Sequence, residues 1–128
     1  MSFFTAVNCI DGRVQLPVIE YLKKRYNVRY IDSITEPGPN LILAEETDKN
    51  LLDSILKRTT ISITKHKSSG IAIVGHADCA GNPAGEKEQM THIRKSVRFL
   101  RQQFPQTEIV GLWVAPPWDV REVEIGKD

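Results

Sequence analysis

The segment that most constrains the fold of this chain is Ile71-Ala72-Ile73-Val74, which is apolar at every position. A strand without a polar face is typical of a parallel sheet that helices cover on both sides. Gly75 and His76 follow this segment directly. We therefore expect it to form a buried parallel strand that ends in a polar loop.

Strand-like and helix-like patterns alternate along the rest of the chain. Short apolar runs predict further strands over residues 3–8, 28–31 and 108–114. Helical spacing of apolar residues predicts helices over residues 17–26, 47–63 and 90–104, the second of them capped by Thr47. Residues 35–40 hold two prolines around a glycine, where we expect no regular structure. The alternation predicts the α/β class, with a mostly parallel four-stranded sheet flanked by helices.

The strand order decides which loops meet. If the first and third strands are central neighbours, in the order 2-1-3-4, the ligand crevice lies where the order reverses, between Cys9 and His76. Residues 120–125 alternate in polarity and could add an edge strand. At 128 residues with 41% hydrophobic content, the chain is expected to be a single domain over residues 1–128.

Composition excludes several classes of function. With 17 basic and 16 acidic residues the formal charge is +1, so we expect neither nucleic acid nor an anionic membrane as a partner. No apolar run approaches the ~20 residues that a membrane span needs. The first residues enter a strand-like run without a signal-peptide pattern, which predicts a cytoplasmic protein. In that compartment thiols stay reduced, so two distant cysteines favour metal binding or catalysis over a disulfide.

Both cysteines and one histidine stand where predicted strands end. Cys9 follows the first strand, and His76 and Cys79 follow the third with a spacing that lets one turn direct both side chains at one point. Two thiolates and an imidazole are ligands that Zn²⁺ prefers, and a three-ligand set leaves the fourth position open for water or substrate. Asp11 could accept a hydrogen bond beside that position. Arg13 could hold the Asp11 carboxylate bidentately and keep it from the metal.

These residues carry a resemblance to a known family. Cys-x-Asp-x-Arg after the first strand and His-x-x-Cys after the third resemble the β-class carbonic anhydrases, and the order of elements agrees over residues 3–114. The resemblance implies Cys9, His76 and Cys79 as zinc ligands and Asp11 with Arg13 as the catalytic pair. Two loops depart from the family pattern: Ala80 stands before Gly81, and Thr35-Glu36-Pro37-Gly38 replaces an Arg-Asn-Ala-Gly-like stretch.

The resemblance also implies an activity. The expected reaction is attack of zinc-bound hydroxide on carbon dioxide to give bicarbonate, in a homodimer or higher homo-oligomer whose active site is completed at the subunit interface. Two alternatives stay open. One is hydrolysis of a related small electrophile such as carbon disulfide or carbonyl sulfide. The other is a zinc-binding interaction or sensor protein without turnover, in which Asp11 takes the fourth zinc position.

Simpler interpretations exist for most of these residues. Cys9 and Cys79 could be small buried hydrophobic residues, and Asp11 with Arg13 a turn residue and a surface ion pair. His66 is expected to be solvated, and His92 to be structural or on the surface. The two tryptophans, Trp113 and Trp118, are expected in the core or at a subunit contact rather than in a substrate site.

Overall fold

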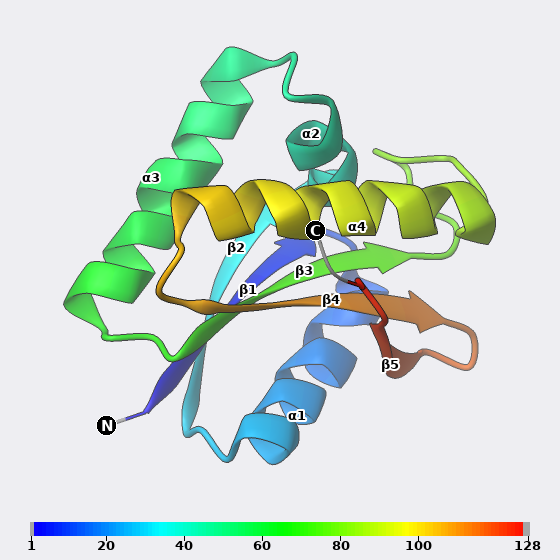
Figure 1. Ribbon diagram of the computed structural model, residues 1–128. Coiled ribbons are helices and arrows are strands. Elements are labelled where there is room, and N and C mark those ends of the chain that lie inside the picture. The colour runs from blue at the N-terminus through cyan, green and yellow to red at the C-terminus, as the bar shows by residue number, and fades with distance from the viewer. Residues whose placement is uncertain (1, 127–128) are drawn as a thin grey trace.

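A five-stranded sheet lies at the centre of the molecule, and helices cover both of its faces (Figure 1). The computed structural model describes residues 2–126. The strands are β1 (Phe3–Cys9), β2 (Tyr30–Glu36), β3 (Gly70–His76), β4 (Glu108–Ala115) and β5 (Asp119–Val123). The helices are α1 (Gln15–Tyr26), α2 (Pro39–Glu45), α3 (Lys49–Lys65) and α4 (Glu86–Gln103), and a 3₁₀ turn, η1 (Gly12–Val14), precedes α1.

The strand order is β2-β1-β3-β4-β5, which confirms the predicted arrangement. β1, β2, β3 and β4 run parallel, whereas β5 turns back to pair antiparallel with β4 and forms the additional edge strand. Every residue of β3 is buried, as its apolar sequence predicted. Because β1 and β3 are neighbours, the carboxyl ends at Cys9 and His76 lie at the same edge of the sheet.

Two apolar layers hold the helices against the sheet. On one face, α1 packs Val18 and Leu22 against β1 and β3. On the other face, α2, α3 and α4 bury a larger cluster that includes Ile55, Ile93 and Leu100 (Figure 1). No helix within residues 2–126 is long and apolar enough to cross a bilayer.

Three local predictions were wrong. The second strand begins at Tyr30, later than expected, and runs through to Glu36. Its pattern was hard to recognise because β2 is an edge strand and carries polar side chains. Residues 35–40 contain the end of β2 and the start of α2, since a proline at the first helical position, here Pro39, fits a helix. The cap of α3 is Asp48 rather than Thr47, because the Asp48 carboxylate accepts a hydrogen bond from the Leu51 N–H at 3.2 Å.

Candidate metal centre

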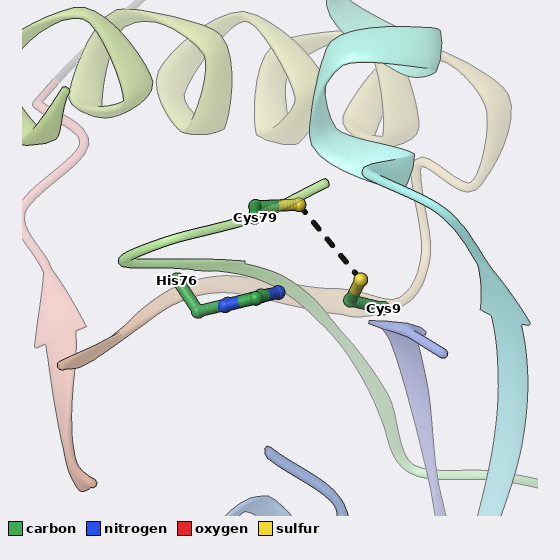
Figure 2. Close-up of side chains that lie close together, drawn as sticks. All are labelled: Cys9, His76 and Cys79. Carbon is green, nitrogen blue, oxygen red and sulfur yellow. Dashed lines mark hydrogen bonds between the residues drawn. The ribbon is translucent and has the colours of Figure 1, made fainter. Parts of the chain in front are cut away.

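The side chains of Cys9, His76 and Cys79 converge beyond the carboxyl ends of β1 and β3 (Figure 2). Cys9 is the last residue of β1, His76 is the last residue of β3, and Cys79 lies in the loop that leads to α4. The two Sγ atoms are 3.8 Å apart, and the potential ligand atoms of all three residues lie within 4.8 Å of one another. All three residues are buried. The structure thus brings together the three residues that the sequence singled out, in a geometry that can hold a metal ion.

The imidazole of His76 is oriented as a metal ligand requires. Its Nδ1 lies 2.8 Å from the carbonyl oxygen of Ala77, which can only accept, so Nδ1 carries the proton. Nε2 then keeps its lone pair, and this buried atom has no hydrogen-bond partner among residues 2–126. A buried polar atom without a partner is unusual and costly. A metal ion between Nε2 and the two sulfurs would satisfy it.

The two thiols differ in their electrostatic surroundings. Burial opposes ionisation of Cys9, but the neighbouring His76 and the backbone N–H groups of Gly38 and Asp11 outweigh it and lower the Cys9 pKa to about 7. Burial and the adjacent Cys9 raise the pKa of Cys79, although backbone N–H groups oppose this, one of them Asn82 N–H at 3.3 Å from Sγ. Two thiolates this close repel each other, and a cation between them would remove the repulsion.

Burial lowers the pKa of His76, but the nearby Cys9 and the Ala77 carbonyl raise it overall. A cation would therefore compete with a proton for Nε2, so metal binding should strengthen as pH rises. Two sulfurs and one imidazole nitrogen are the donors that suit zinc. On these grounds the residues present fit a zinc ion.

Asp11 and Arg13 form the bidentate pair that the sequence suggested. The Arg13 side chain donates to both carboxylate oxygens of Asp11, from Nε at 3.0 Å and from Nη2 at 2.7 Å, and the Arg13 backbone N–H donates to Oδ1 at 2.8 Å. These hydrogen bonds lower the pKa of Asp11 to about 2. Asp11 is therefore an anionic acceptor at any physiological pH, held by Arg13 at the turn that directly follows Cys9.

Arg13 is itself held by two residues that sequence reasoning did not place at the site. Asp78 accepts from Arg13 through its carboxylate at 3.2 Å and its backbone carbonyl at 3.1 Å. The guanidinium also lies 4.5 Å from the ring centre of Trp118, in the turn between β4 and β5. Asp78 could have been noticed, since it lies inside the His-x-x-Cys motif. Nothing local in the sequence connects Trp118 with Arg13, and Trp118 also packs against the core as expected.

The two loops that depart from the family pattern cross each other beside the cysteines. A Cβ atom on Gly81 would lie 2.3 Å from the carbonyl carbon of Pro37, and one on Gly38 would lie 2.6 Å from the carbonyl carbon of Gly81. Gly38 also has a left-handed backbone, with φ of 61°. This glycine crossing, Gly38 over Gly81, brings the backbone N–H of Gly38 to Cys9 and those of Gly81 and Asn82 to Cys79. Both glycines can be read from the sequence, but their contact is visible only in the folded structure.

The remaining histidines and Trp113 lie outside the centre. His66 is half exposed and pairs with Asp32 at 2.6 Å, so it is less free than the expected solvated side chain. His92 Nδ1 lies 3.0 Å from the side-chain nitrogen of Asn82, which agrees with a structural role. Trp113 is buried in the core, as expected.

Comparisons with known proteins agree with this architecture. The family model described as "Putative carbonic anhydrase" matches residues 1–124. A solved β-carbonic anhydrase from Aspergillus fumigatus, CafA, aligns over 98% of this chain and 76% of its own, with a TM-score of 0.60 and 11% identity. One of two tetrameric β-carbonic anhydrases solved from Sordaria macrospora aligns over 98% of this chain and 82% of its own, with a TM-score of 0.60 and 13% identity. No curated protein matches the sequence.

Proposed function

Since the chain belongs to the carbonic anhydrase family that this model describes, we propose that it is a zinc-dependent lyase that hydrates carbon dioxide to bicarbonate and a proton. The observation that carries the proposal is the buried, unpartnered Nε2 of His76, which lies within 4.8 Å of the sulfurs of Cys9 and Cys79. These three atoms would hold the zinc. When bound, zinc lowers the pKa of a coordinated water to near neutrality and so supplies the nucleophile.

The surrounding residues prepare the ligands for that role. The Ala77 carbonyl fixes the tautomer of His76, and the backbone N–H groups of Gly38 and Asn82 favour the thiolate forms of the two cysteines. Because the partner of each ligand is a backbone group, these contacts do not depend on the rotamer of any further side chain. The ligand set would therefore be formed before the metal arrives.

Asp11 is proposed as the hydrogen-bond acceptor that orients the attacking water. Its low pKa keeps it ionised, and Arg13 occupies both carboxylate oxygens and holds them in place. Asp78 and Trp118 in turn limit the movement of Arg13. Because Arg13 holds both carboxylate oxygens of Asp11, this arrangement favours an open fourth position on the metal over a state in which Asp11 is itself a ligand.

We also propose that the protein works as a homodimer or higher homo-oligomer. Ile10 and Leu16 flank the Asp11–Arg13 pair in sequence and are 58% and 69% exposed. Apolar side chains this exposed beside a substrate site are consistent with a face that a second subunit covers. Free buried cysteines at the site fit a reducing compartment such as the cytoplasm.

The first test is metal content per chain on protein purified under reducing conditions, followed by stopped-flow carbon dioxide hydration across pH. We expect close to one zinc per chain and measurable turnover. Asp11→Ala should lower kcat/KM by about 10- to 100-fold while zinc content is kept. The matched control is Asp53→Ala, which removes an exposed carboxylate on α3 and should leave the rate unchanged.

Other outcomes would redirect the proposal. Zinc binding without hydration, but with hydrolysis of carbon disulfide or carbonyl sulfide, would indicate a related lyase or hydrolase. Zinc binding without turnover of any of these substrates would indicate an interaction or sensor protein. Protein that neither contains nor takes up zinc would refute the proposed function altogether.

A further inference from the structure

A cluster of three buried side-chain amides lies directly behind the metal-binding loop. Its members are Asn40 of α2, Asn82 of the loop after β3, and Gln89 of α4, and each is at most 1% exposed. Buried amides are rare unless their hydrogen bonds are satisfied, because each would otherwise lose its contacts with water. The amide cluster is not part of the candidate ligand set, and its contacts indicate a different role.

Gln89 makes the central contacts of the amide cluster. Its Nε2 lies within hydrogen-bond distance of three backbone carbonyls, those of His76 at 2.9 Å, Ala84 at 3.1 Å and Asn82 at 3.2 Å. These carbonyls span the whole loop that carries His76 and Cys79. One side chain on a long helix thus connects both ends of the segment that supplies two of the three candidate ligands.

The other two amides hold Gln89 in the required orientation. Asn40 Nδ2 donates to Gln89 Oε1 at 3.1 Å, which directs the Gln89 Nε2 at the loop. Asn82 Nδ2 donates to Asn40 Oδ1 at 3.3 Å and so closes the cluster. Gly75 leaves the space for it, since a Cβ there would lie 2.7 Å from Asn40 Nδ2 and 2.9 Å from Gln89 Oε1.

The amide cluster also reaches a sulfur. The backbone N–H of Asn82, whose side chain belongs to the cluster, donates to Cys79 Sγ at 3.3 Å. A shift of the loop would therefore change both the position of His76 and the hydrogen bond to the Cys79 sulfur. Groups that orient metal ligands in this way typically change metal affinity by about 10- to 100-fold when removed.

We propose that Gln89 is a positioning residue for the metal centre: it holds the His76–Cys79 loop in its metal-binding conformation and thereby sets zinc affinity and coordination geometry. This inference rests on the proposed zinc site, but it assigns a role to a residue outside the ligand set. Gln89 is not one of the candidate ligands. It acts through the backbone of the loop.

The test compares Gln89→Met with the wild-type protein. Methionine has a similar length but cannot donate to the three carbonyls. We expect zinc affinity, measured by competition with a chromophoric chelator, to fall by about 10- to 100-fold. In the Co²⁺-substituted protein, the intensity of the visible absorption bands, which report tetrahedral geometry, should fall as well.

Val97→Ala is the matched control. Val97 lies on the same helix and is fully buried, but its side chain packs in the apolar cluster and can make no hydrogen bond to the amide cluster or to the loop of residues 76–84. It should lower the free energy of unfolding without a comparable change in zinc affinity or cobalt absorption. This comparison separates a positioning role from a general loss of packing.

The outcomes are distinct. If Gln89→Met binds zinc within threefold of wild type and keeps the cobalt spectrum, the inference is refuted while the zinc site stands. If Gln89→Met does not fold, the same measurements are made on Gln89→Asn, whose shorter polar side chain cannot reach all three carbonyls. Zinc affinity within threefold of wild type and an unchanged cobalt spectrum would again refute the inference. Wild-type protein that binds neither zinc nor cobalt would refute the proposed function, and this inference with it.

Discussion

The glycine crossing predicts a large effect for Gly81→Ala. The new Cβ would lie 2.3 Å from the carbonyl carbon and 2.5 Å from the carbonyl oxygen of Pro37, whereas ordinary contacts lie at 3.4–4 Å. The neighbours are backbone atoms and cannot rotate away, so the two loops must separate by about 1 Å, and overpacking of this kind costs about 1–3 kcal/mol. The separation also moves the N–H of Gly38 away from Cys9 and that of Asn82 away from Cys79.

We therefore expect Gly81→Ala to lower the free energy of unfolding of the metal-free protein by about 1–3 kcal/mol. Urea unfolding, followed by circular dichroism, measures this directly. The control is Gly85→Ala in the same loop, where a Cβ would meet no atom within 4 Å among the described residues. A Gly81→Ala protein as stable as Gly85→Ala, with wild-type zinc affinity, would show that the loops do not need this close crossing.

Three further predictions concern stability. Tyr26→Phe should raise the free energy of unfolding by about 1 kcal/mol, because the buried hydroxyl has no hydrogen-bond partner within residues 2–126. Burial raises the Tyr26 pKa from 10.0 to about 12, so the wild type should lose stability relative to the variant as pH rises through that interval. If the free energies of unfolding of the two proteins change equally between pH 10 and pH 12, this prediction is wrong. Thr59→Val removes another buried hydroxyl that has no hydrogen-bond partner in the described part of the chain, and it should raise the free energy of unfolding in urea by about 1 kcal/mol. A lower free energy of unfolding would show that the Thr59 hydroxyl makes a stabilising hydrogen bond. Zinc at about 100 times its Kd should raise the free energy of unfolding by about 2.7 kcal/mol. Cys79→Ser, which removes one proposed ligand, should abolish most of this increase. An equal increase in both proteins would show that zinc binds elsewhere.

Strand and helix alternation could be predicted from the sequence because it depends on local periodicity. The all-apolar segment in β3 and the helical spacing in α4 can each be recognised within a short stretch of sequence. The prediction failed at β2 and α2, where local signals conflict with tertiary placement. β2 is polar because it lies at the edge of the sheet. Pro39 begins a helix directly after Pro37 and Gly38, where the sequence predicted irregular structure.

The candidate ligands could be predicted because their chemistry lies in their identity. Cys9, His76 and Cys79 follow strands that the predicted order 2-1-3-4 makes neighbours, and the structure confirms that order; parallel neighbours bring their carboxyl ends together. Asp11 and Arg13 are two residues apart, so their pairing is a local event. The supports of the site were missed, since Gln89 and Trp118 become relevant only through contacts with segments far away in the sequence.

Local periodicity and residue type were enough to predict the fold class and the five side chains proposed for the zinc site, whereas the predicted strand order needed the structure to confirm it. How these side chains are held follows from the folded structure alone. The crossing of Gly38 with Gly81, the amide cluster behind the His76–Cys79 loop and the ring of Trp118 beside Arg13 all depend on backbone paths that meet after folding. A pattern of residues can name the groups that bind a metal, but distances between remote segments set their orientation and charge.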